Sequence, residues 1–383
     1  MEGGQPVKSP GTGLILTGGG ARAAYQVGVL LAVAKLSSNP RRNPFPILCG
    51  TSAGAINAAS IACVADDFGK AVGILADVWR NMRAGDIYRA DAIGIGASVA
   101  RWLSMLVAGW LVRNPPRSLL DNSPLRELLV RHLDFSGIER SIANGALHAV
   151  SITASGYESG ESLSFFQAHP SAHPWRRVKR LGIRAPLAVE HLLASSAIPF
   201  IFPPTRIHRE YFGDGSMRQL TPISPAVHLG AERILVVGAN QANEAFDRQK
   251  VEFHPSFAQI AGHALSSIFL DGLAVDIERM QRINETLSAI PPEIRAASDI
   301  PLRLIKTLVI SPSERLERIA AEHAGALPAP VKAMLTGIGA MNRQGGALTS
   351  YLLFEQPFTR TLIDLGYADT MARDTEVGDF LGL

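Results

Sequence analysis

The first part of the chain alternates short apolar runs with longer apolar stretches that lack proline. Apolar residues fill 14–17 and 46–49, and each run is followed by a glycine-rich loop. The stretches 21–35 and 53–64 that follow these loops are long enough for buried helices, and the second is rich in small residues, which allow a helix to lie close to a sheet. Strand, loop and helix repeated in this way indicate βαβ units and a parallel α/β fold.

The same pattern resumes later and then changes. We expect strands at 148–153, 161–166, 206–212 and 233–238, and helices at 188–197 and 222–229. From about Gln241 onward the sequence becomes helical in pattern and more charged. Within that region, 311–314 (SPSE) has the residues of a helix start, with Ser311 as N-cap and Glu314 completing a capping box.

Composition sets broad limits on the class of protein. The 383 residues are 47% hydrophobic and 19% charged, so a large core is possible, and the formal net charge of +3 does not suggest a nucleic-acid partner. The N-terminal sequence has no secretory signal pattern, so we expect a cytoplasmic protein, peripheral on the inner membrane if it meets lipid. Cys49 and Cys63 have no disulfide-framework or metal-ligand spacing, and we expect buried, reduced thiols and no metal site.

A glycine loop, 18–23 (GGGARA), lies between the first strand and its helix, where backbone N–H groups favour negative charge. As G-x-G-x-x-A it matches a dinucleotide fingerprint, which requires an acidic residue about 20 positions later. The chain has no Asp or Glu between Glu2 and Asp66. Arg41 and Arg42 could hold an NADP phosphate instead, although they precede the second strand. A third interpretation is a purely structural tight turn.

The same loop also suits an oxyanion hole, which needs backbone donors near a nucleophile. The first and second strands are expected to be neighbours, so their carboxyl ends, at 18–20 and 50–54, would open at the same edge of the sheet. The second of these segments reads GTSAG, a G-x-S-x-G sequence between a strand and a helix. Such a context is typical of a nucleophile elbow, where glycines let the backbone pass closely and raise the serine above the sheet. The alternative is that Ser52 is only an N-cap residue.

The residue that would activate Ser52 must be found further along the chain. An α/β-hydrolase has the order Ser, then Asp or Glu, then His, yet no histidine after position 214 lies in a loop just past a predicted strand. The histidines considered are His228, His254, His263 and His323. Asp214 does stand at such a position, between two glycines after an apolar strand. Its alternative role is an ordinary Asp-Gly hairpin turn.

These motifs together resemble the patatin-like phospholipases. The resemblance rests on 18–22 for the glycine-rich loop, 50–54 for the serine motif, 194–199 (ASSAIP) and 214–216 for the Asp-Gly motif. It covers roughly 13–240, and the remainder, 241–383, loosely matches the helical C-terminal extension of bacterial members. One departure is Ser216, where the family often has glycine or alanine. The fold implied is a three-layer α/β/α arrangement with a largely parallel central sheet.

The resemblance also implies a chemistry. It makes Ser52 the nucleophile and Asp214 the general base, in a dyad without histidine and without cofactor or metal. It assigns the oxyanion hole to Gly18, Gly19, Gly20 and Ala21 and supporting roles to Arg22, Gly50, Gly54 and Gly215, although Arg22 could be a surface arginine at a helix start. The expected substrate is a membrane phospholipid or another lipid ester. Rival interpretations are an NADP-binding oxidoreductase and a non-catalytic lipid-binding scaffold.

One further segment, 93–112, has 20 residues and the single charge of Arg101. That length could span a bilayer, but its place inside one α/β unit and its two tryptophans, Trp102 and Trp110, favour an interfacial or lid helix. A buried core helix or a homodimer contact is the alternative. The arginines that follow it would suit anionic lipid headgroups or a solvated face: Arg113, Arg117, Arg126 and Arg131.

Overall fold

The computed structural model describes residues 11–92, 94, 96, 118–238, 257–297, 302–337, 340–341 and 346–383, with residues 257–271 and 296 described by their backbone alone. The predicted interfacial segment 93–112 therefore lies outside the described residues, apart from Gly94 and Gly96. Arg113, Arg117, His254 and the side chain of His263 lie outside them as well.

Within the described residues, ten strands form one sheet in the order β10-β9-β1-β2-β3-β4-β6-β5, with β8 pairing β3 and β7 pairing β8. The neighbours from β10 to β3 are parallel, and the antiparallel pairs lie beyond β3. The strands are β1 (Thr12–Leu16), β2 (Ile47–Thr51), β3 (Ala149–Gly156), β4 (Ser162–Ala168), β5 (Trp175–Arg177), β6 (Arg180–Arg184), β7 (Thr205–Ile207), β8 (Glu210–Asp214), β9 (Arg233–Val237) and β10 (Lys306–Ile310).

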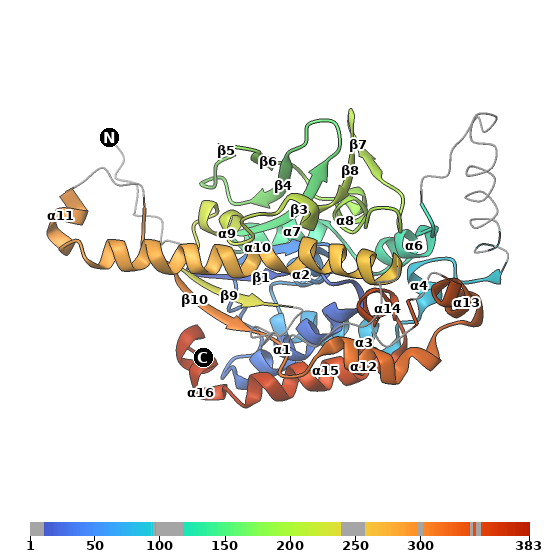
Figure 1. The fold of residues 1–383 in the computed structure, drawn as a ribbon. Coiled ribbons are helices and arrows are strands. Elements are labelled where there is room, and N and C mark those ends of the chain that lie inside the picture. Colours follow the sequence, from blue (N-terminus) through green and yellow to red (C-terminus); the bar gives the residue numbers. More distant parts are fainter. Residues whose placement is uncertain are drawn as a thin grey trace, which may run out of the picture.

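Helices cover both faces of this sheet (Figure 1). They are η1 (Gly20–Ala23), α1 (Ala24–Leu36), α2 (Ala53–Cys63), α3 (Phe68–Asn81), α4 (Ala84–Ile87), α6 (Ser123–His132), α7 (Ser136–Ala143), α8 (Val189–Ser195), η3 (Gly215–Arg218), α9 (Ser224–His228), α10 (Phe257–Ser288), α11 (Pro292–Ala297), α12 (Leu316–His323), η4 (Ala324–Ala326), α13 (Ala329–Gly337), α14 (Gly346–Leu352), α15 (Gln356–Met371) and α16 (Asp374–Leu381).

The two faces of β1 show why the sheet is buried on both sides. Leu14 and Leu16 belong to the core that α1, α2 and α3 cover, whereas Ile15 belongs to a second core beneath α9 and α10. Successive side chains of a strand point to opposite faces, so a strand covered on both faces must be apolar throughout. The predicted three-layer α/β/α fold with a largely parallel sheet is confirmed.

Helix α1 is apolar around its whole circumference because it lies between the sheet and α15. The two helices approach backbone to backbone: a Cβ atom on Gly28 would lie 2.0 Å from the Ile363 carbonyl oxygen, and one on Gly366 would lie 2.1 Å from that of Tyr25. The Tyr25 hydroxyl also donates a hydrogen bond of 2.9 Å to Asp369 of α15. The C-terminal part thus adds a layer outside α1.

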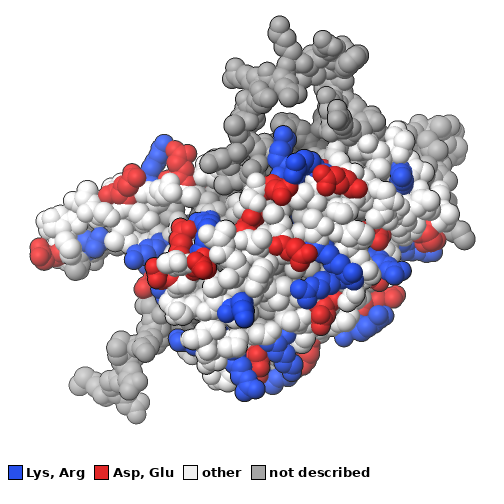
Figure 2. Space-filling model, turned by 90° about the horizontal axis from the view of Figure 1, so that it is seen from below, with Lys and Arg blue, Asp and Glu red and all other residues white. Residues whose placement is uncertain are grey.

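The C-terminal part also contributes a strand, which the sequence pattern did not reveal. β10 pairs in parallel with β9 and extends the same sheet. On the outer face that Figure 2 shows, acidic and basic side chains are interspersed rather than separated by sign. Pairs such as Arg318–Glu314 and Arg373–Glu376 are examples of this mixing in the C-terminal part.

Two local predictions were wrong. The expected single strand over 206–212 is the hairpin β7–β8, because His208 adopts a positive φ of 52° and turns the chain. The expected helix start at 311–314 is four residues early, since α12 has Arg315 as its N-cap and begins at Leu316. The Ser313 N–H donates instead to Asp369 of α15, so a tertiary contact takes the place of the capping box.

Candidate active site

The glycine loop and the serine motif meet at one edge of the sheet, as expected. β1 and β2 are parallel, with Leu16 opposite Gly50, so the segments that follow them leave the sheet side by side. A Cβ atom on Gly54 would lie 2.2 Å from the Leu16 carbonyl oxygen, and one on Gly50 would lie 2.4 Å from that of Gly54. Both glycines are therefore required by close backbone contact.

Ser52 occupies a strained turn between β2 and α2. Its φ of 55° and ψ of −130° lie in a region that residues with a side chain rarely adopt, and the residue is only 1% exposed. Among the residues that the structure describes, the Ser52 hydroxyl caps no backbone N–H of α2. The N-cap alternative is therefore not supported, and the geometry is that of an elbow.

A second serine fixes this elbow. The Ser52 N–H donates a hydrogen bond of 2.8 Å to the Ser195 hydroxyl, which in turn donates one of 2.6 Å to the Thr153 carbonyl oxygen. Ser195 ends α8 and is fully buried. Ser195 belongs to the segment 194–199, which the resemblance included without giving Ser195 this role. Its hydrogen bond joins positions 143 residues apart, a contact that the motif alone does not predict.

Asp214 ends β8 and is completely buried. Its N–H donates to the Ala197 carbonyl oxygen at 2.9 Å, and its Oδ1 accepts the Ser216 N–H at 2.9 Å. Gly215 is required here because a Cβ atom would lie 2.0 Å from the Thr153 carbonyl oxygen. Asp214 is the N-cap of η3 and does not form the turn of a hairpin, so the hairpin-turn alternative is wrong.

The environment of Asp214 makes it a stronger base than an ordinary carboxylate. Burial raises its pKa to about 6, and hydrogen bonds from Ser52 and Ser216 oppose that rise. Its second oxygen, Oδ2, accepts no well-formed hydrogen bond from any described residue, although the Ser52 hydroxyl is close enough to lower the pKa.

The glycine loop is held by buried amides. The Gln26 side-chain amide donates a hydrogen bond of 2.7 Å to the Thr17 carbonyl oxygen. The Asn57 amide donates one of 3.0 Å to the Gln26 side chain, and the Trp79 indole N–H donates one of 2.8 Å to Asn57. Of the four residues expected to form the oxyanion hole, Gly20 lines the same cavity as Ser52.

Gly18, Gly19 and Ala21 are buried beside Gly20. Arg22 is fully buried, which overturns the surface-arginine alternative.

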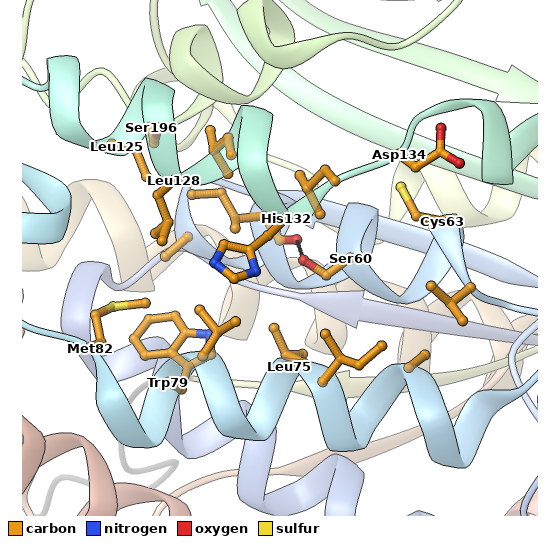
Figure 3. A pocket seen from close by; sticks show the side chains of 18 of the residues that line it. Ser60, Cys63, Leu75, Trp79, Met82, Leu125, Leu128, His132, Asp134 and Ser196 are labelled. Atoms are coloured by element: carbon orange, nitrogen blue, oxygen red, sulfur yellow. Dashed lines mark hydrogen bonds between the residues drawn. The ribbon is translucent and has the colours of Figure 1, made fainter.

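Ser52 and one face of α2 line an apolar crevice of about 310 Å³. Figure 3 shows this crevice from close by. One face of α2 forms its floor, and α3 and α6 form its walls. Met82, Leu125 and Ser196 lie at one end, and Cys63 and Asp134 at the other. The lining side chains from α2, α3 and α6 include Ala53, Ile56, Ser60, Ala71, Leu75, Trp79, Leu128 and Leu129.

The histidines do not supply a triad in the described structure. His228 stacks on Trp175 at 4.9 Å on the opposite face of the sheet, and burial lowers its pKa to about 4. His323 contacts Thr361 in the C-terminal part. His132 of α6, which the sequence did not single out, projects into the crevice (Figure 3). Its signal, a polar residue on an amphipathic helix, is too general to have marked it.

The dinucleotide alternative is not favoured. Arg41 and Arg42 line a cavity with Gly11 and Thr12, at the amino end of β1. The glycine loop follows the carboxyl end of the same strand. Because β1 has five residues in extended conformation, its two ends are roughly 16 Å apart. An NADP phosphate on these arginines could not share a site with that loop.

No group of three or more His, Cys, Asp or Glu side chains among the described residues is arranged to hold a metal ion. No helix that these residues form is both long and apolar enough to cross a membrane. Cys49 and Cys63 are free and buried, as expected.

The model of the patatin-like phospholipase family matches residues 14–227, more than half of the chain. The chain belongs to this family. A cGAMP-activated phospholipase of Pseudomonas aeruginosa (strain BWHPSA011 / Pa011) is 27% identical over 206 residues, which are 53% of this chain and 52% of that protein. The match thus spans about half the length of this relative.

The chain is similar to several solved structures, among them VipD and ExoU. VipD from Legionella pneumophila has a TM-score of 0.39 and 13% identity, covering 96% of this chain and 67% of VipD. The type III effector protein ExoU has a TM-score of 0.28 and 17% identity, covering 98% of this chain and 89% of ExoU.

Proposed function

We propose that the protein is a serine hydrolase that cleaves acyl ester bonds of membrane lipids, with Ser52 as nucleophile and Asp214 as general base. One observation carries this proposal: a strained serine elbow lies beside a buried carboxylate of raised pKa, at the end of an apolar crevice. Membership of the patatin-like phospholipase family supports the same reaction class.

In the proposed reaction, Ser52 Oγ attacks the ester carbonyl carbon while its proton passes to Asp214. The carbonyl oxygen becomes an oxyanion, which backbone N–H groups of the glycine loop near Gly20 stabilise. Collapse of this intermediate expels the alcohol, which takes the proton from Asp214. Water then attacks the acyl-enzyme with Asp214 again as base, and the fatty acid leaves as Ser52 Oγ recovers a proton.

The crevice suits the acyl chain of the substrate. Its floor, α2, has 11 residues and is therefore roughly 16 Å long. An extended hydrocarbon advances roughly 1.3 Å per carbon for C–C bonds of about 1.5 Å, so the floor accommodates about 12 carbons. Each methylene buried there contributes about 0.8 kcal/mol, which favours long acyl chains over short ones.

The mouth of the crevice suits contact with a lipid surface. Ile198 and Phe202 line the crevice, and Phe200 between them is 73% exposed. The Leu119 N–H donates a hydrogen bond of 2.7 Å to the Phe200 carbonyl oxygen, so Leu119, seven residues after the end of the segment 93–112 in the sequence, lies beside this mouth. Membrane contact here would pass lipid directly to the crevice.

The test is chemical labelling together with lipid analysis. A fluorophosphonate should label the parent at Ser52, and Ser52→Ala should abolish both labelling and release of fatty acid from phospholipid vesicles. Thr370→Ala, which removes a buried hydroxyl of α15, is the control and should be labelled normally. Fatty acid release by Ser52→Ala at the parental rate would refute the proposal. A parent that binds vesicles but is not labelled would be a lipid-binding scaffold.

A further inference from the structure

The glycine loop is held by two helices that lie beyond the family match. Arg22, in η1, is fully buried and reaches into the C-terminal part. Its Nε donates 2.8 Å to the Ser350 hydroxyl of α14, and its guanidinium forms an ion pair of 2.7 Å with the Glu317 carboxylate of α12. The same guanidinium lies 4.3 Å from the centre of the Tyr351 ring.

These partners determine whether Arg22 is stable where it is. A buried guanidinium loses its hydration and is tolerated only when charged and polar partners replace it. The start of a helix adds to this cost, since its exposed N–H groups disfavour a cation. Removing the negative charge of Glu317 would leave the positive charge of Arg22 buried near the N–H groups at the start of η1. Relieving this unfavourable interaction would require η1 to move.

A backbone contact joins the same helix to the site itself. Gly20 has a positive φ of 55°, and a Cβ atom on it would lie 2.3 Å from the Tyr351 carbonyl oxygen. Gly20 also lines the cavity with Ser52. Helix α14 therefore abuts a loop residue that lines the cavity with Ser52, so a shift of α14 or of η1 would be transmitted to that loop.

We propose that Glu317 and Ser350 are positioning residues, which hold Arg22 and thereby set the orientation of the backbone N–H groups at Gly20 toward Ser52. This inference rests on the proposed hydrolase function. It makes the C-terminal helices a part of the catalytic apparatus, although the residues act on the substrate only through Arg22 and the loop. The stabilisation they confer is needed in the transition state, when the oxyanion forms, rather than for substrate binding.

The experiment compares Glu317→Gln and Ser350→Ala with the parent on a short, water-soluble ester, which needs no membrane. We expect kcat to fall about tenfold, below the loss for removing an oxyanion donor outright, with KM little changed. The rate of fluorophosphonate labelling should fall in parallel, because the phosphonyl oxygen occupies the same hole. Glu314→Gln is the matched control: Glu314 pairs with Arg318 on the exposed surface at the start of α12 and should leave kcat unchanged.

A double-mutant cycle separates positioning from general stability. Because both side chains act through Arg22, the variant with Glu317→Gln and Ser350→Ala should lose little more kcat than the worse single variant. Adding Glu317→Gln to the Arg22→Met variant should not lower kcat any further. Parental kcat in both single variants, or a fall in kcat matched by an equal fall in the folded fraction on thermal melting, would overturn the inference. Activity of Ser52→Ala in the same assay would instead refute the hydrolase proposal.

Discussion

The Ser52 N–H and the Ser195 hydroxyl form a hydrogen bond of 2.8 Å that ties the strained turn to β3. A residue at a positive φ remains in place only when its surroundings hold it, and here one hydroxyl serves both the turn and the Thr153 carbonyl oxygen. The strain that presents Ser52 to the crevice is thus maintained by a residue from another part of the chain.

Ser195→Ala should therefore reduce activity more than stability. It removes one buried hydroxyl, which lowers the free energy of unfolding by about 1–2 kcal/mol. The loosened turn should also reduce kcat by at least tenfold, since small errors in nucleophile position are costly. Thr370→Ala, which removes a buried hydroxyl of α15, provides the comparison and should lose a similar amount of stability while keeping the parental kcat. Thermal melting measures the stability, and kinetics on a soluble ester measure kcat. Equal kcat in the two variants would contradict a positioning role for Ser195.

The pH profile should reveal the pKa of Asp214. A general base acts only when ionised, so kcat/KM should fall as the pH drops below about 6, the pKa that burial gives Asp214. The Ser216 hydroxyl lowers this pKa, so Ser216→Ala should move the acid limb to higher pH. The measurement is kcat/KM from pH 4.5 to 8.5 on a soluble ester. If Ser216→Ala does not change the pH at which kcat/KM falls on the acid side, a residue other than Asp214 is the base.

Much of the fold followed from the sequence because local patterns encode it. The apolar runs of β1 and β2, the glycines of the elbow and the small residues of α2 all predict contacts close in the sequence. β10 could not be found in this way, since its pairing with β9 joins segments about 70 residues apart and its KTLVI sequence is too short to distinguish a strand from a buried helix.

The site divides in the same way. Ser52, Asp214 and the glycine loop stand in motifs, and the structure brings Ser52, Asp214 and Gly20 together. The contacts that hold them do not stand in motifs: Ser195 lies 143 residues from Ser52, and Ser350 lies 328 residues from Arg22. Their serine hydroxyls resemble many others in the sequence until the fold places them.

A bulky side chain in the middle of the crevice should shorten the acceptable acyl chain. Ser60 lies in the floor, and its hydroxyl bonds only to the Ile56 carbonyl oxygen of its own helix among the described residues. Ser60→Phe should leave hydrolysis of a butyrate ester near the parental rate. Excluding about four methylenes from the crevice should cost a dodecanoate ester about 3 kcal/mol, or roughly 100-fold in kcat/KM.

The control for this series is Ser60→Ala, which removes the hydroxyl without filling the crevice and should keep the parental preference for long chains. Kinetics on p-nitrophenyl esters of increasing chain length measure both variants. A parallel loss on butyrate and dodecanoate in Ser60→Phe would indicate that the elbow itself is disturbed. An unchanged chain-length profile would show that acyl chains lie elsewhere.

Phe200 combines two unfavourable features that suggest contact with lipid. It is 73% exposed, and its φ of 66° is a conformation that favours glycine. Phe200→Gly removes the strain, so the melting temperature should not fall below that of the parent. It also removes an aromatic ring from the mouth of the crevice, so binding to phospholipid vesicles and hydrolysis of vesicle lipid should both weaken. Hydrolysis of a short soluble ester should not change.

Val275→Ser tests whether any exposed apolar residue would give this result. Val275 is 62% exposed on α10, which covers the opposite face of the sheet from the crevice. Vesicle sedimentation and fatty acid release should distinguish the two variants, with Val275→Ser behaving as the parent. If Phe200→Gly sediments with vesicles as well as the parent does, the crevice mouth is not the membrane contact.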